Sequence, residues 1–214
     1  MVNIEKYKEI ISFLQASHAT LVAVSKIKPA SDIKMMYDLG QRDFGENYVQ
    51  ELVEKQTQLP TDILWHFIGH LQSNKVKYIA PFVHLIQSID SEKLLKEVDK
   101  QAAKNNRKIN VLLQVHIAEE QTKFGFNENE LMKLDVELYP NVTIKGLMGM
   151  ATFTDDKEKV KREFEKLQSC YNQFKIEKNI DLNTLSMGMS DDYELAINCG
   201  SNMIRIGSLL FGRR

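Results

Sequence analysis

The feature that most constrains the fold of this chain is the alternation of short apolar runs with longer amphipathic stretches along its whole length. The runs have the length of strands, and the stretches carry apolar residues at helical spacing. No segment rich in proline, glycine or serine interrupts the alternation, so we expect one domain over residues 1–214. The predicted strands are Leu21 to Val24, Asp43 to Phe44, Leu64 to Ile68, His84 to Ser88, Val111 to Ile117, Ile144 to Met148, Thr184 to Met187 and Met203 to Ile206.

Helical spacing is clearest in the stretch that precedes the seventh predicted strand. Val160, Phe164, Leu167, Tyr171 and Phe174 follow one another at steps of three or four residues. This pattern predicts one long helix that buries a single apolar stripe.

An opening helix over about residues 3–17 is predicted from Ile4, Tyr7, Ile11 and Leu14, which share one helical face. Capping residues mark several other helix ends. These signals are Ser91, Asn127 with Glu130, Asp191 with Glu194, and the C-terminal glycines Gly40 and Gly200.

Eight strand and helix units with strands that are apolar on both faces predict an α/β fold, a (β/α)8 barrel. The 214 residues make a compact example of a fold that typically takes roughly 250. A doubly wound open sheet is the alternative, because strand order is not visible in one sequence.

The charge balance argues against a nucleic-acid partner. Lys and Arg total 28 against 29 Asp and Glu, which gives a net charge of −1, whereas nucleic-acid binding needs a basic face. The N-terminus lacks the apolar core of a signal peptide, and no apolar run is long enough for a bilayer. We therefore expect a cytoplasmic protein, with Cys170 and Cys199 as buried free thiols.

The residue after the first predicted strand is Lys26, a candidate Schiff-base nucleophile. Val22, Val24 and Lys26 alternate onto one face, which points into the interior of a closed parallel barrel. Desolvation there favours the neutral amine that attacks carbonyls. The alternative is a lysine that ends a strand and extends into solvent.

The last two predicted strands are followed by segments suited to phosphate. Gly188 to Asp191 and the pair Gly207-Ser208 supply glycines, hydroxyls and backbone N–H groups, at the place where such barrels commonly bind phosphate. Arg205 shares strand parity with Gly207 and needs a partner there, either a ligand or a carboxylate of the barrel. Together with Lys26, these groups suit a phosphorylated aldehyde.

Several sequence blocks carry a family resemblance over nearly the whole chain: LVAVSK, FGENYVQEL, WHFIGHLQSNK, GLMGM, LSMGMS and the closing GSNMIRIGSLLFGR. The sequence resembles the pyridoxal phosphate homeostasis proteins, single-domain relatives of the alanine racemase barrel. The resemblance implies a cofactor, pyridoxal 5′-phosphate (PLP), held as a Schiff base. The implied cofactor-binding residues are Lys26 for the Schiff base, Ser190, Gly207 and Ser208 for the phosphate, Arg205 for the pyridine nitrogen, and Asn47 beside the ring.

The chain departs from the family pattern at three positions, where threonine is usual: Ile27, Asn202 and Ser208. Ser208 keeps the hydroxyl, whereas Ile27 and Asn202 leave contacts around the site open.

The resemblance implies a carrier in vitamin B6 homeostasis rather than an enzyme. A permanently charged guanidinium at Arg205 favours an unprotonated ring nitrogen, which is a weak electron sink. Racemases with this arginine also use a base from a second domain, which the sequence does not contain. We expect a monomer that meets PLP-dependent recipient enzymes transiently.

Three enzyme hypotheses remain as alternatives. A PLP-dependent racemase would need its missing base from Tyr48, His70 or Tyr193. A Schiff-base aldolase for a sugar phosphate would use Lys26 and the phosphate loops alone. A metal hydrolase is suggested by His66 and His70, but Gly69 between them and the missing HExxH motif favour two separate barrel histidines.

Overall fold

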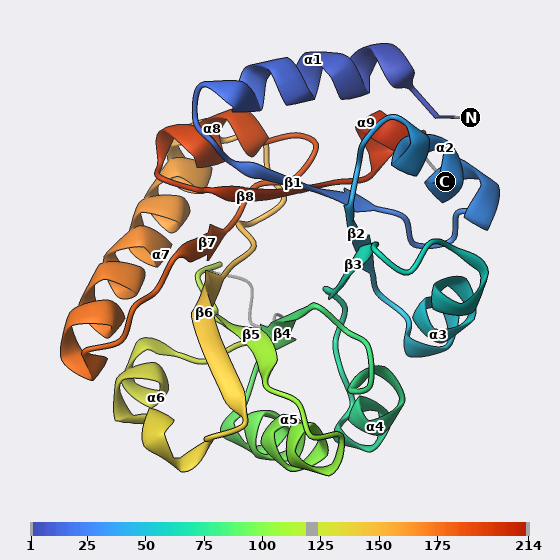
Figure 1. Cartoon of the computed structure of the whole chain (residues 1–214). Helices are drawn as coiled ribbons and strands as arrows, with labels where there is room; N and C mark the ends of the chain where they lie inside the picture. The colour runs from blue at the N-terminus through green and yellow to red at the C-terminus, as the bar shows by residue number, and fades with distance from the viewer. Residues whose placement is uncertain (1, 119–123, 213–214) are drawn as a thin grey trace.

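The computed structural model describes residues 2–118 and 124–212, in which eight parallel strands close into a barrel (Figure 1). The strands follow one another around the barrel in chain order, and β8 returns to pair with β1. This arrangement confirms the predicted (β/α)8 barrel, since an open doubly wound sheet leaves its edge strands unpaired. The strands are β1 (Thr20–Val24), β2 (Asp43–Glu46), β3 (Leu64–Phe67), β4 (Leu85–Ile89), β5 (Ile109–Gln114), β6 (Val142–Met148), β7 (Thr184–Ser186) and β8 (Met203–Ile206).

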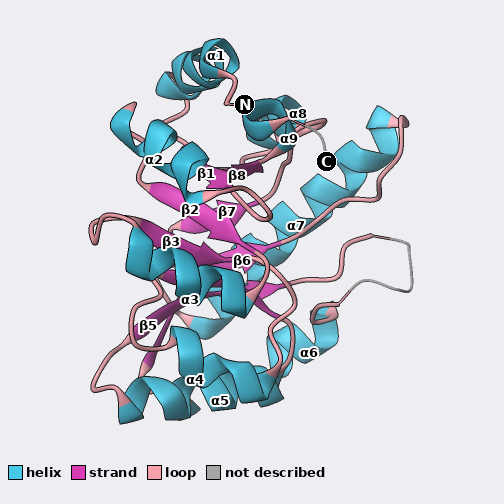
Figure 2. Cartoon of the chain, turned by 90° about the vertical axis from the view of Figure 1, so that its right-hand side faces the viewer, coloured by secondary structure: helices cyan, strands magenta, loops and turns pink. Residues whose placement is uncertain are grey.

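Helices cover the outside of the barrel (Figure 2), because a crossover between parallel strands must pass over the sheet. No helix among the described residues is both long enough and apolar enough to cross a membrane. The α-helices are α1 (Ile4–Gln15), α2 (Ala30–Asp38), α3 (Val49–Gln58), α4 (Val76–Ile79), α5 (Glu92–Lys104), α6 (Glu128–Lys133), α7 (Lys157–Lys178), α8 (Tyr193–Asn198) and α9 (Ser208–Phe211), and the short 3-10 turns are η1 (Ser73–Lys75) and η2 (Val136–Leu138).

The long predicted helix is α7. Of the predicted stripe it buries Val160, Phe164, Leu167 and Phe174, whereas Tyr171 is only half-buried. In α1 the buried residues are Tyr7, Ile10 and Leu14.

The predicted stripe of α1 was therefore partly wrong, because Ile4 is exposed and Ile11 is only half-buried. The N–H of Asn3 donates to the carbonyl of Leu210 at 2.7 Å, which ties the start of α1 to α9 at the edge of the barrel. The buried face of α1 is instead the one that carries Tyr7, Ile10 and Leu14. Arg213, at the end of the closing sequence block, lies outside the described residues.

The predicted glycines Gly40 and Gly200 follow the C-caps of α2 and α8 with positive φ, as expected. The predicted N-terminal caps were confirmed for two helices and wrong for a third. Asn127 and Glu130 form a capping box on α6, and the Ser91 hydroxyl accepts from the N–H of Leu94 in α5. The N-cap of α8 is Asp192 rather than Asp191, and its side chain does not cap the helix. Its carboxylate is engaged outside the helix, by the N–H of Met189 at 2.6 Å.

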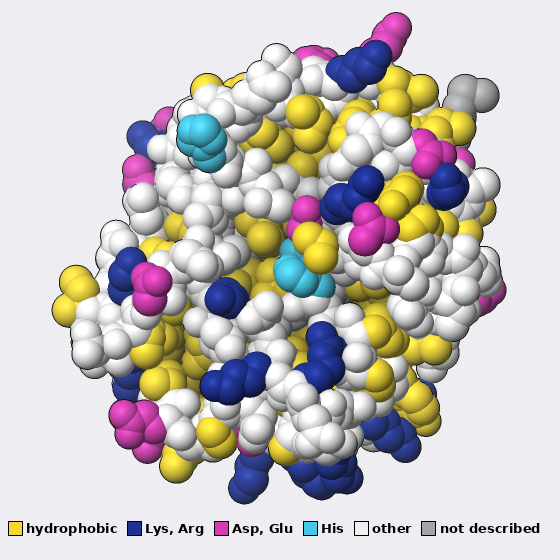
Figure 3. All heavy atoms as spheres, in the orientation of Figure 1, with side chains coloured by type: hydrophobic (Ala, Val, Ile, Leu, Met, Phe, Trp, Pro, Cys, Tyr) yellow, Lys and Arg dark blue, Asp and Glu magenta, His cyan; other side chains and the backbone are white. Residues whose placement is uncertain are grey.

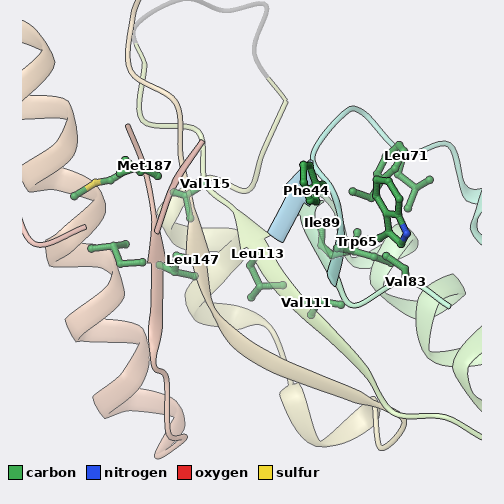
Figure 4. Packing of buried hydrophobic residues seen from close by; sticks show 14 of the residues in the cluster. Phe44, Trp65, Leu71, Val83, Ile89, Val111, Leu113, Val115, Leu147 and Met187 are labelled. Carbon is green, nitrogen blue, oxygen red and sulfur yellow. The ribbon is translucent and has the colours of Figure 1, made fainter. Parts of the chain in front are cut away.

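Strand alternation divides the buried side chains into two layers. The larger cluster fills the space between the strands and the helices, and Phe44, Trp65 and Leu113 belong to it (Figure 4). A small separate cluster comes from inward positions of five strands, as expected for the filled interior of a barrel. It consists of Val22, Leu85, Leu112, Met148 and Met203.

Candidate functional site

The strands that carry most of the predicted site, β1 and β8, are neighbours in the closed barrel. Val22 pairs with Arg205 in parallel register, so the segments that follow the two strands emerge side by side. A Cβ atom placed on Gly207 would lie 3.2 Å from the carbonyl oxygen of Val24. Gly207 is therefore packed against the end of the strand that leads to Lys26.

Lys26 lies half-buried in the turn directly after β1. The preceding residue, Ser25, is fully buried, and its hydroxyl donates to Glu46 Oε1 at 2.6 Å. Glu46 has the strand parity of Phe44, which belongs to the layer between the strands and the helices. The turn that carries Lys26 is thus anchored on its N-terminal side to the outer layer of the barrel.

Arg205 is buried inside the barrel, as its strand parity predicts. Its Nη1 donates to Ser186 Oγ at 2.6 Å, and its Nη2 donates to the carbonyl of Gly149 at 3.0 Å. Burial lowers the pKa of the Arg205 guanidinium to about 10, and the charge of Asp192 opposes this shift. Arg205 therefore remains a charged donor near neutral pH, and these two partners are a hydroxyl and a carbonyl rather than a carboxylate.

A chain of hydrogen bonds leads from Arg205 through the barrel interior. Ser186 Oγ donates to Gln87 Oε1 at 2.7 Å, Gln87 Nε2 lies 2.9 Å from His66 Nδ1, and His66 Nε2 lies 2.9 Å from Asp43 Oδ1. Because an ionised Asp43 only accepts, His66 carries its proton on Nε2 and accepts from Gln87. Each group in the chain then donates to the next one in the direction of Asp43. This order fixes the orientation of the Ser186 hydroxyl, which accepts from Arg205.

Sequence reasoning did not identify Ser186 or Gln87. The available signal was a polar residue at an inward position within an apolar run, since Gln87 shares parity with Leu85 of the interior cluster. The role of such a residue can be assigned only when its hydrogen-bond partner on another strand is known.

The two histidines of the metal hypothesis have separate partners. His66 belongs to the interior chain, whereas His70 Nδ1 lies 2.9 Å from Asp90 Oδ2. The His70 ring also stacks on Phe124, with 4.1 Å between the ring centroids. These contacts agree with two separately satisfied histidines.

Of the two tyrosines considered as racemase bases, one lies at the surface and the other packs between helices. Tyr48 is exposed at the start of α3. Tyr193 is buried, packs edge-on against Phe13 at 5.6 Å between ring centroids, and donates to Glu194 at 3.1 Å. Tyr193 thus joins α8 to α1.

Asn47 follows β2 and presents a buried acceptor. In the described part of the chain, its Oδ1 is buried and has no hydrogen-bond partner. A Cβ atom placed on Gly69 would lie 2.3 Å from the Asn47 carbonyl oxygen, so only glycine permits this approach of the β3 loop. A buried acceptor without a donor is costly unless a ligand satisfies it.

The predicted phosphate residues lie in the loops after β7 and β8. Ser190 is half-buried, and it follows Gly188, which has a φ of +97°. A side chain on Gly188 would also meet the Cβ of Ala196 at 2.6 Å. Ser208 is exposed in the first turn of α9, directly after Gly207. The loops thus leave two serine hydroxyls at the same end of the barrel.

Asn202, which stands where the family usually has threonine, makes two hydrogen bonds that explain its side chain. Its Oδ1 accepts from the N–H of Leu185 at 2.8 Å, and its Nδ2 donates to the carbonyl of Asn183 at 2.7 Å. Asn202 therefore joins the start of β8 to β7 and supports the strand that carries Arg205.

The partly buried carboxyl of Asp192 lies beside the predicted phosphate loop, where it accepts from the N–H of Met189. Burial raises its pKa above the ordinary value, while the Met189 N–H and the charge of Arg205 oppose this shift. A carboxyl whose pKa is higher in the folded state reduces stability as the pH rises through its folded pKa.

We expect Asp192→Asn to stabilise the fold near neutral pH, because the amide oxygen still accepts from Met189 and position 192 no longer carries a desolvated charge. Urea unfolding at several pH values measures this effect. The difference in unfolding free energy between variant and wild type should shrink toward acid pH, where Asp192 is protonated. A difference that is constant across pH would contradict this account.

A cavity lies next to the predicted site rather than within it. Its volume is about 830 Å³, and it is lined by Lys6 of α1, by Thr152 and Asp155 after β6, and by Ser190 and Asp191. Of the six predicted cofactor residues, only Ser190 lines it. On the face in Figure 3, charged side chains of both signs surround apolar and histidine side chains near the centre.

A family model described as "Alanine racemase, N-terminal domain" matches residues 3–214. A protein of Aquifex aeolicus named "Pyridoxal phosphate homeostasis protein" is 43% identical over 200 residues, which cover 92% of this chain and 87% of that protein. A protein of the same name from Pasteurella multocida is 41% identical over 206 residues, with 92% and 88% coverage.

Among solved structures, PipY of Synechococcus elongatus with PLP bound is similar over the whole barrel. The two chains superpose with a TM-score of 0.90 at 35% identity, and the match covers 97% of this chain and 99% of PipY.

Proposed function

Because the chain belongs to the family of pyridoxal phosphate homeostasis proteins, we propose that it binds PLP reversibly as a Schiff base on Lys26. In this role it takes part in vitamin B6 homeostasis, buffering the cofactor or delivering it to other enzymes. The observation that carries the proposal is the pairing of β1 with β8, which joins the Lys26 turn, Arg205 and Gly207 at one mouth.

The chemistry of the donor set supports the fit of PLP. When bound, PLP supplies an aldehyde that condenses with amines and a ring that accepts electrons. The Lys26 amine provides the nucleophile, and Ser190, Gly207 and Ser208 provide hydroxyl and backbone donors for a phosphate. Buried Asn47 Oδ1 still has an acceptor site to satisfy, which a ligand with a donor would fill.

Arg205 supports a carrier rather than a catalyst. Its guanidinium is held by Ser186 and Gly149 and stays charged, so it can only donate to a ring nitrogen. A ring nitrogen that accepts a hydrogen bond is less protonated, and the ring then withdraws electrons from a bound amino acid less strongly. The relatives are likewise named for homeostasis and not for a reaction.

We further propose that residues 1–214 act as one cytoplasmic domain, as a monomer that meets recipient enzymes transiently. Burial raises the pKa of Cys170 to about 11 and also raises the pKa of Cys199. Two buried, unreactive thiols are compatible with a reducing compartment.

The test is the visible absorption spectrum of the purified protein with PLP, before and after borohydride reduction. We expect a Schiff-base band whose reduction leaves a stable adduct, and mass spectrometry should place that adduct on the peptide containing Lys26. Added L-amino acids in deuterated water should give no exchange of the α-hydrogen. Exchange with turnover would overturn the carrier proposal in favour of racemase-like catalysis, and absence of any band would overturn PLP binding.

A further inference from the structure

The turn that carries Lys26 contains a backbone conformation that its residues disfavour. Ile27, directly after Lys26, has a φ of +63°. A β-branched side chain rarely adopts this left-handed region, because its Cβ crowds the backbone. The Ile27 side chain is 57% exposed, so burial of its apolar atoms does little to hold it there. Another contact must therefore hold this turn.

That contact is a carboxylate of α3. The N–H of Ile27 donates to Glu51 Oε1 at 2.6 Å. The same oxygen accepts from Lys55 Nζ at 2.5 Å, one helical turn further along α3. Glu51 therefore holds the peptide group that follows Lys26, and Lys55 holds Glu51.

Lys55 also holds the peptide group on the other side of Lys26. Its Nζ donates to the carbonyl of Ser25 at 2.8 Å and to Glu46 Oε1 at 2.7 Å, so all three of its N–H donors are used. The Lys55 side chain is 6% exposed and that of Glu46 is fully buried. Removal of Lys55 would leave the Glu46 carboxylate buried without its cationic partner, which is costly.

We propose that Glu51 and Lys55, supported by Glu46, are positioning residues that clamp the two peptide groups flanking Lys26 and so aim its amine at the PLP aldehyde. The inference rests on the proposed function, since it assigns Lys26 as the nucleophile. The clamp acts on the backbone of the turn. It is built from α3 and β2, outside the barrel interior, and is separate from the Arg205 chain.

The structure offers a variant that removes the clamp with little loss of core. Glu51→Ala removes the acceptor of the Ile27 N–H, and Glu51 is partly exposed at 21%. Glu51→Gln keeps an acceptor oxygen at the same place. Adding Ile27→Gly to Glu51→Ala removes the Cβ that makes the positive φ unfavourable, so the turn can persist without the carboxylate. Asp38→Ala is the matched control, because it removes an exposed ion pair with Lys34 on the neighbouring helix α2.

Two measurements are made on each full-length variant. Hydrogen exchange of the Ile27 amide, followed by NMR in the protein without PLP, reports the clamp directly. Titration with PLP, followed by the Schiff-base band and by borohydride trapping, measures PLP affinity and imine formation at Lys26.

We expect Glu51→Ala to lose protection of the Ile27 amide and to bind PLP about tenfold more weakly, as loss of a strained turn geometry implies. Glu51→Gln should keep most of the protection, the double variant should recover most of the affinity, and Asp38→Ala should match wild type in both measurements.

The proposed clamp is contradicted if the Ile27 amide in Glu51→Ala stays as protected from hydrogen exchange as in wild type. It is also overturned if that protection is lost while PLP affinity is unchanged. A wild-type protein that forms no Schiff base at Lys26 would instead overturn the proposed function. The exchange of the Ile27 amide would then decide by itself whether Glu51 holds the turn.

Discussion

Replacement of Lys26 by alanine is expected to abolish the Schiff-base absorption band completely. The effect is all or none, because the imine forms on the amine that the substitution removes. The nearby amines of Lys28 and Lys55 are engaged, Lys28 by the carbonyl of Phe211 and Lys55 by Ser25 and Glu46. Lys26 lies in a turn and is only half-buried, so the fold should persist. Absorption spectra with added PLP, together with borohydride trapping and mass spectrometry, measure the loss.

Lys34→Ala is the control for this experiment. Lys34 lies on α2, close to Lys26 in sequence, and pairs with Asp38 at the surface. Its loss should leave the band unchanged. Circular dichroism should give both variants the spectrum of the wild type. A band of full intensity in Lys26→Ala would assign the imine to another lysine and refute the central role given to Lys26.

Replacement of Arg205 by leucine is expected to separate cofactor affinity from stability. Loss of a charged donor to the ring nitrogen should weaken PLP binding by at least about tenfold, since such a hydrogen bond contributes about 1.5–3 kcal/mol. Stability should change less. Ser186 Oγ and the Gly149 carbonyl each lose a donor, but the desolvation that lowers the Arg205 pKa also disappears.

PLP titration and thermal unfolding of the Arg205→Leu protein measure the two effects. Arg205→Lys should give an intermediate affinity, because it keeps the charge but loses the fork that reaches two partners. Arg42→Leu is the control for affinity, since Arg42 forms an ion pair with Asp62 at 3.0 Å, with exposed fractions of 38% and 56%. An Arg205→Leu protein that binds PLP as tightly as wild type would exclude Arg205 from the cofactor site.

The barrel and the strand ends could be predicted from the sequence because both depend on local patterns. Apolar runs separated by helical stretches define the strands, and the residue after each run then falls at one mouth. Lys26 and Ser190 could be singled out on this basis. Their assignment to PLP came from the family resemblance, and their role in binding stays a prediction.

The contacts that hold the site could not be predicted because they depend on tertiary packing. Gln87 is one polar residue in an apolar run, and its role depends on a hydrogen bond from Ser186 on another strand. Lys55 reads as a surface residue of an amphipathic helix, yet it is buried against Ser25 and Glu46. The positive φ of Ile27 contradicts its local preference, as functional turns often do.

The closure of β8 onto β1 has a consequence for synthesis of the protein. Lys26 precedes Arg205 by 179 residues, so it leaves the ribosome long before Arg205 and Gly207. Their pairing is a contact of very high sequence separation, and such contacts form late in folding. If these residues hold PLP as proposed, a nascent chain exposes the lysine long before its proposed ring and phosphate partners. We then expect specific capture of PLP to begin only when the barrel closes.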